Sequence, residues 1–292
     1  MGILKLPPGL VACQLGAPPE AQVTHGSLAV FVTKGATVPM GWDTKELVAR
    51  SKELGRDCFS ALSGLTVAGE DVRQLVVSTL YARILELYHG VPFLLDVGLL
   101  PPAQVVTRVL MEALFTIRAV AADEETLRRY VGADEHRKLK IIGKSQGSER
   151  KPLAELGDQR IEEIVKEIQE NIAEHELKPP LSAEALAHKA GLHDWYLIEY
   201  TLLSTAVHSS ISELHEYLDL DEEEELQGFR FATFRGRDAA GTIALSSLSL
   251  LKAHETLADV FGLDPLVVDE KHGEFFKELM RQVQESADDE RG

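Results

Sequence analysis

The chain has 292 residues, of which 45% are hydrophobic and 26% are charged, and its formal net charge is −17. This length suits one large domain or two modest ones, and the composition is that of a globular protein. An acidic surface repels nucleic-acid phosphates, so we do not expect generic binding of DNA or RNA.

Apolar stretches are interrupted too often to cross a membrane, so no membrane segment is predicted. Two cysteines, Cys13 and Cys58, are too few for a disulfide framework, and free thiols indicate a reducing compartment. We therefore expect a cytoplasmic protein. No G-x-G-x-x-G, H-E-x-x-H or C-x-x-C motif is present, and Glu-x-x-His occurs only once, so no cofactor and no metal are predicted.

The first 41 residues lack helical periodicity and are rich in proline and glycine. We expect residues 1–41 to form an irregular arm, in which Ser27–Thr33 can make one short strand. The rest of the chain, residues 42–292, is predicted to be a single helical domain with its C-terminal helices between 242 and 286.

From residue 43 onward, apolar residues recur at helical spacing. The predicted helices cover residues 43–64, 70–89, 101–122, 123–140, 158–176, 182–191, 194–218, 242–261 and 270–286. Gly90 and Pro92 should end or kink the second helix, and residues 143–157 should form a loop. Helix 101–122 is apolar on most of its surface, which predicts a central position. The expected fold class is all-α, an irregular multi-helix bundle.

Two charged residues, Arg108 and Glu112, lie one turn apart in this central helix. Burying charges is costly unless they pair with each other or with a ligand. An arginine can hold a carboxylate through two parallel hydrogen bonds. The pair can therefore be a structural ion pair or the polar anchor of a cleft.

A second polar set lies on the predicted helix 194–218, where Tyr200, Ser204 and His208 are spaced four apart. Their side chains should form a ladder on one face of that helix. Histidine titrates near neutral pH and can act as a general base. The alternative is a hydrogen-bonded ladder between helices.

A third pattern pairs Arg83 with His89, with five residues between them, and Arg129 with His136 shows a similar spacing. Metal-independent ribonucleases of the HEPN class use an arginine followed by a histidine at this kind of spacing. A continuous helix would place Arg83 and His89 on different faces, so the chain would have to turn after Gly90 to bring them together.

The segment FRFATFRGR, residues 229–237, interleaves aromatic residues with arginines. Such a segment can stack on single-stranded bases, and it is the one place where we consider nucleic-acid binding. The alternative is a packed loop whose arginines pair with the acidic residues just before it.

The segments LYARILELYHGVPFLLDVGL, TRVLMEALFTIRAV and LAHKAGLHDWYLIEYTLLSTAVHSSI together resemble the bacterial family of unknown function DUF5677, over roughly residues 70–220. Members carry Arg-x-x-x-Glu on a hydrophobic helix and Tyr-x-x-x-Ser-x-x-x-His on a later one. The resemblance implies a mostly helical domain and, from the setting of some members, a role in bacterial stress or defence. It implies these site positions: Arg83, Arg108, Glu112, Tyr200, Ser204 and His208.

We therefore expect a helical protein that binds an unidentified ligand or protein partner in a buried polar cleft lined by those six residues. One alternative is a HEPN-type ribonuclease, a toxin or antiviral effector, with Arg83, His89 and His208 as catalytic candidates. Another is a structural or oligomerisation subunit, held by the outer helix 158–176. A homodimer is a separate expectation, and the ribonuclease would act across it.

Overall fold

The computed structural model describes residues 44–67, 69–150, 152–207, 214, 217–221, 225–230, 236–263, 272–279 and 281. These residues are mostly helical, with one small two-stranded sheet, so the all-α fold class is confirmed. The expected N-terminal arm, residues 1–41, lies outside the described residues, and the single domain over 42–292 stays a prediction.

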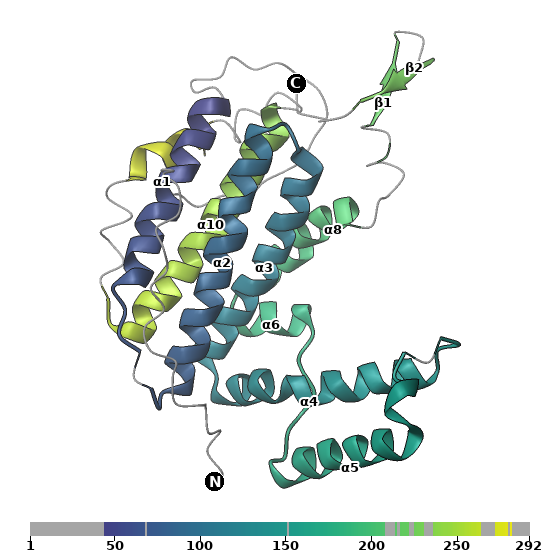
Figure 1. Ribbon diagram of the computed structural model, residues 1–292. Coiled ribbons are helices and arrows are strands. Elements are labelled where there is room, and N and C mark those ends of the chain that lie inside the picture. The colour runs from purple at the N-terminus through teal and green to yellow at the C-terminus, as the bar shows by residue number, and fades with distance from the viewer. Residues whose placement is uncertain are drawn as a thin grey trace.

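Four long helices make up the main bundle (Figure 1). They are α1 (Thr44–Ser63), α2 (Val72–Asp96), α3 (Leu100–Ala122) and α10 (Gly236–Phe261). Helix α2 packs against α1, α3 and α10, and α10 also packs against α1 and α3. Their facing apolar side chains form one hydrophobic core, to which Phe275, Phe276 and Leu279 of the helical residues 272–279 add.

The expected central helix is α3, which contacts α2, α10, α4, α6 and α8. Leu110, Met111, Leu114 and Ile117 are fully buried along it. Helix α10 is buried even more completely, because every residue from 239 to 251 is buried. Its sequence did not distinguish it from the other helices, so the bundle has two central helices rather than one.

The end predicted for the second helix is wrong, because α2 continues through Gly90 and Pro92 to Asp96. A proline inside a helix removes one backbone hydrogen bond. Here Val91, Pro92 and Leu95 are buried against the bundle. Burial of these side chains offsets the lost hydrogen bond, so tertiary packing overrides the local signal.

The α4–α5 hairpin consists of α4 (Glu124–Gln146), a short 3₁₀ turn η1 (Ala154–Leu156) and α5 (Asp158–Glu174), and it lies at one end of the bundle (Figure 1). Helix α4 continues to Gln146, so the start predicted for the loop 143–157 is wrong. On α5 only Ile161 and Ile168 are buried, as expected for an outer helix with a narrow apolar stripe.

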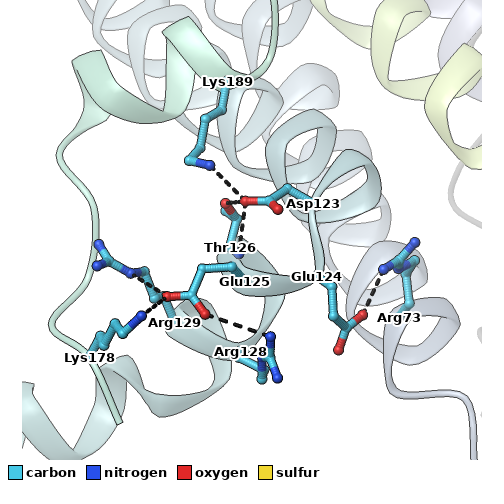
Figure 2. Close-up of polar contacts among 9 residues, drawn as sticks. All are labelled: Arg73, Asp123, Glu124, Glu125, Thr126, Arg128, Arg129, Lys178 and Lys189. Atoms are coloured by element: carbon cyan, nitrogen blue, oxygen red, sulfur yellow. Dashed lines mark hydrogen bonds and ion pairs between the residues drawn. The ribbon is translucent and has the colours of Figure 1, made fainter. Parts of the chain in front are cut away.

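A cluster of ion pairs attaches this hairpin to the bundle (Figure 2). Asp123 caps α4 by accepting a hydrogen bond from the backbone N–H of Thr126, and it also accepts one from Lys189 on α6 at 2.7 Å. The hydrogen bond from Lys189, followed by that from Thr126, holds the pKa of Asp123 well below its usual range. The first turn of α4 is therefore fixed to α6.

The next two residues of α4 extend the cluster in other directions (Figure 2). Glu124 pairs with Arg73 on α2 at 2.7 Å, and Glu125 accepts a hydrogen bond from Lys178 at 2.6 Å. Arg129 also donates to Glu125, at 3.3 Å. Lys178 lies in the segment before α6, so α2, α4 and the approach to α6 meet at one acidic turn.

Four short elements follow: α6 (Ala183–Lys189), α7 (His193–Trp195), the π-helical turn η2 (Tyr196–Tyr200) and α8 (Thr201–Val207). Ser182 caps α6 by accepting from the N–H of Ala185. Helices α6 and α8 both pack against α3. The predicted helix 194–218 is thus irregular at its start, and the later part of it, residues 208–213, lies outside the described residues.

The chain then forms a hairpin of β1 (Leu218–Leu220) and β2 (Leu226–Phe229), at the other end of the bundle from α4 and α5 (Figure 1). Residue 218 was expected at the end of a helix and lies in a strand instead. Arg230 donates to Asp219 at 2.9 and 2.6 Å, because the antiparallel pairing brings the two close together. This arginine of the segment 229–237 therefore pairs with an acidic neighbour.

Within the described ranges, no helix combines the length and apolar character needed to span a membrane.

Candidate functional site

Four polar side chains, from α3, the turn η2 and α8, meet on the surface of α3. Arg108 donates from Nε to the Oγ of Ser204 at 3.0 Å and from Nη2 to the hydroxyl of Tyr200 at 2.6 Å. Its Nη1 lies 3.1 Å from Oε1 of Glu112, one turn further along α3. We call these four residues, Arg108, Glu112, Tyr200 and Ser204, the Arg108 network.

Two further hydrogen bonds close the network. Tyr200 donates its hydroxyl proton to Oε1 of Glu112 at 2.5 Å, and Ser204 donates to the backbone carbonyl of Tyr200 at 2.8 Å. Burial, and then the hydrogen bond to Glu112, raises the pKa of Tyr200 well above its usual value. The phenol therefore stays protonated at neutral pH and acts as a hydrogen-bond donor rather than as a base.

The members of the network differ in exposure in a definite order. Tyr200 is 7% exposed, the side chain of Arg108 is 16% exposed, and that of Glu112 is 40% exposed. The guanidinium carbon of Arg108 lies 4.3 Å from the centre of the Tyr200 ring, within the range of a cation–π contact. The positive charge therefore lies inside, and the carboxylate faces the solvent.

A row of stacked rings leads along the chain to this network. His193 stacks on Tyr196 with ring centres 6.3 Å apart, and Tyr196 stacks on Tyr200 at 5.0 Å. Phe115 of α3 contacts Tyr200 from another side, with ring centres 6.0 Å apart. The rings fix the position of Tyr200, so its hydroxyl is held between Arg108 and Glu112.

The π-helical turn η2 is the local feature that sequence reasoning missed. Thr201 donates its hydroxyl proton to the carbonyl of Tyr196, five residues earlier, at 3.0 Å. Turns of this kind occur frequently at functional sites.

Glu199 lies in the same turn, is 5% exposed, and its Oε2 has no hydrogen-bond partner within the described residues. Burial raises its pKa. The sequence did carry a signal for the burial of Glu199, because it lies four residues from both Trp195 and Leu203 and so shares a helix face with them.

Arg83 does not join the Arg108 network in the described structure. It is exposed on α2 and has no hydrogen-bond or ion-pair partner among the described residues. His208, the last residue of the predicted ladder, lies outside the described residues, so its distance from Arg108 is not described. The structure thus brings together four of the six predicted site residues.

His89 lies six residues after Arg83 on one uninterrupted helix, so the two side chains project from different faces. Its ring packs on Gly55 of α1, where a Cβ would come 2.4 Å from the ring Cε1. Its Nε2 is buried without a partner among the described residues, and burial lowers the pKa of the imidazole. The turn after Gly90 that a ribonuclease pair would need is absent, because the helix continues to Asp96.

Arg129 and His136, the other arginine–histidine pair, each form a structural contact. Arg129 donates to Glu125 at 3.3 Å, and Nε2 of His136 lies 3.0 Å from the carbonyl oxygen of Leu177. Among the residues that the structure describes, no group of three histidine, cysteine, aspartate or glutamate side chains could hold a metal ion.

A separate polar set lies in the core of the bundle, and sequence reasoning did not predict it. The hydroxyl of Tyr81 lies 2.9 Å from Nδ1 of His254. That of Tyr88 lies 2.8 Å from the Oγ of Ser51 and 3.0 Å from the Oγ of Ser247. The signal was available, because Tyr81 and Tyr88 are seven apart and so lie on one face of α2. These contacts join α1, α2 and α10 and are structural.

The fold and the site together define the class of this protein. It is an all-α bundle that carries a half-exposed network of arginine, glutamate, tyrosine and serine side chains. The chain matches the family of unknown function DUF5677 over residues 74–226 and belongs to that family. The matched range contains the whole Arg108 network but neither α1 nor α10. Comparison with curated proteins gave no match, and comparison with solved structures gave none either.

Proposed function

We propose that the protein binds a ligand or a protein partner at the Arg108 network. The observation that carries the proposal is the convergence of Arg108, Glu112, Tyr200 and Ser204, from helices about 90 residues apart in sequence, on one hydrogen-bonded cluster that reaches the solvent. Because the Glu112 side chain is 40% exposed, a ligand in solution can reach the network.

Two features of the site support binding rather than catalysis. The tyrosine is protonated, and the guanidinium already bonds to three partners. No free general base or nucleophile is present among Arg108, Glu112, Tyr200 and Ser204, except for the carboxylate itself. Rigid preorganised donors and acceptors of this kind reduce the entropy lost when a ligand binds.

The ribonuclease alternative gains no support from Arg83 and His89, whose side chains project from different faces of α2. It remains testable through RNA cleavage by the wild-type chain and by His89→Ala and His208→Ala. Equal cleavage by all three would count against it. Cytoplasmic location, a place in bacterial stress or defence, and homodimer formation stay predictions.

The binding proposal is tested by the thermal stability of the full chain with a set of probes: spermidine, butylguanidinium, butyrate, inorganic phosphate and adenosine. The decisive variant is Arg108→Met with Glu112→Gln, which removes the pair without changing the net charge. The matched control is Arg118→Met with Glu255→Gln, since these two residues form another arginine–glutamate pair, at 3.6 Å.

We expect at least one probe to raise the melting temperature of the wild type and of the control by a few degrees, but not that of the Arg108 variant, because binding to the native state stabilises it. If no probe separates the variant from the control, the proposal is refuted.

A further inference from the structure

We propose that the group bound at the Arg108 network is a cation, an ammonium or guanidinium group, which pairs with the free carboxylate oxygen of Glu112. This inference rests on the proposed function and adds the chemical class of the ligand. It opposes the usual expectation for an arginine in a binding site, which is to bind phosphate or carboxylate.

The first argument comes from the donors. Arg108 has three nitrogens, and each already contacts an oxygen of Ser204, Tyr200 or Glu112. The hydroxyl protons of Tyr200 and Ser204 are donated within the network. One N–H on each of the two Nη nitrogens remains, but the side chain of Arg108 is only 16% exposed, and an incoming anion would meet the Glu112 carboxylate beside it.

The second argument comes from the acceptors. Oε1 of Glu112 accepts from both Arg108 and Tyr200, whereas Oε2 has no partner among the described residues. A carboxylate has about four lone-pair positions, so two remain free on Oε2. At the solvent-facing end of the network, the unused hydrogen-bonding group is therefore an acceptor, and a ligand that binds there must supply the donor.

The third argument is the direction of the charge. The pair is oriented with Arg108 inside, over the ring of Tyr200, and with Glu112 outside. A ligand approaching from the solvent meets the negative end first. The net charge of −17 adds a field that attracts cations and repels anions over a longer range.

Three probes separate the possibilities: butylguanidinium, its neutral isostere butylurea, and the small anion butyrate. Each is titrated into the full chain, and binding is followed by ligand-observed NMR at low salt. The variants are Glu112→Gln, which keeps the shape of the side chain and removes its charge, and Glu255→Gln, a matched loss of a half-exposed, arginine-paired carboxylate on α10.

We expect butylguanidinium to bind about tenfold more tightly than butylurea, because both partners are then charged and their attraction adds to the hydrogen bond. Glu112→Gln should remove that preference. Glu255→Gln should behave as the wild type. If Glu112→Gln does not fold, the comparison of butylguanidinium with butylurea and butyrate on the wild type still decides, and equal binding of all three overturns the inference.

The two proposals fail in different ways. Butyrate binding that is lost on Glu112→Gln or Arg108→Met, without butylguanidinium binding, would overturn the cation inference and leave the binding site intact. If none of the probes, nor any member of the wider set above, responded to changes in the network, both proposals would be refuted.

Discussion

The contact between Gly55 and His89 provides a sharp test of how α1 and α2 pack. A Cβ built on Gly55 would lie 2.4 Å from Cε1 of His89 and 3.0 Å from both ring nitrogens. Gly55→Ala should therefore force the ring or one of the two helices to move. The substitution also has a favourable part, because alanine in a helix interior is better than glycine by about 1 kcal/mol.

The two effects can be separated with a matched control. Overpacking in a tightly packed region costs about 1–3 kcal/mol, so Gly55→Ala should destabilise the chain by a net amount of up to about 2 kcal/mol. Gly90, in α2, would place its Cβ 3.8 Å from Cγ1 of Val106, an ordinary contact. Gly90→Ala should therefore stabilise the chain by about 1 kcal/mol.

The free energy of unfolding, measured in urea for both variants and in a His89→Ala background, decides the matter. Removing the ring should turn Gly55→Ala from destabilising to stabilising, with a coupling energy of about 1–3 kcal/mol. If Gly55→Ala stabilises as much as Gly90→Ala and shows no coupling to His89, the close contact between Gly55 and the His89 ring is refuted. The packing of His89 between α1 and α2 is then refuted as well.

Three further substitutions, together with one control substitution, test other parts of the fold. Tyr88→Phe should lower the free energy of unfolding by about 1–3 kcal/mol, because two buried serine hydroxyls lose a partner; Tyr130→Phe, at an exposed tyrosine, should change it little in the same urea titration. The pKa of Asp123 is lowered in the folded state, so its stabilising effect is present above the unfolded pKa of about 3.9 and is lost as the pH falls below it. Melting curves between about pH 6 and 3 should thus show a shallower loss of stability for Asp123→Asn than for the wild type. Lys189→Ala should flatten the same profile, since its hydrogen bond is the main cause of the lowered pKa, and an unchanged slope would contradict that assignment.

Local signals in the sequence determined several features correctly. The two prolines and the dense apolar residues located α3 to within one residue, and Ser182 marked the start of α6. The spacing of four also placed Arg108 with Glu112, and Tyr200 with Ser204, on shared helix faces. These features depend on residues within one or two turns of each other, which is the range over which helical periodicity and capping act.

The sequence could not show that these two faces meet. Tyr200 bonds to Glu112 across 88 residues of chain, and this contact depends on how α6 to α8 dock on α3. The complete burial of α10 and the passage of α2 through Pro92 have the same origin, since burial against distant helices outweighs local preference. The sequence by itself thus determined the helices and the pairs of polar residues on them. Only the tertiary structure decided that four of these residues form one network, and that its carboxylate, not its guanidinium, faces the solvent.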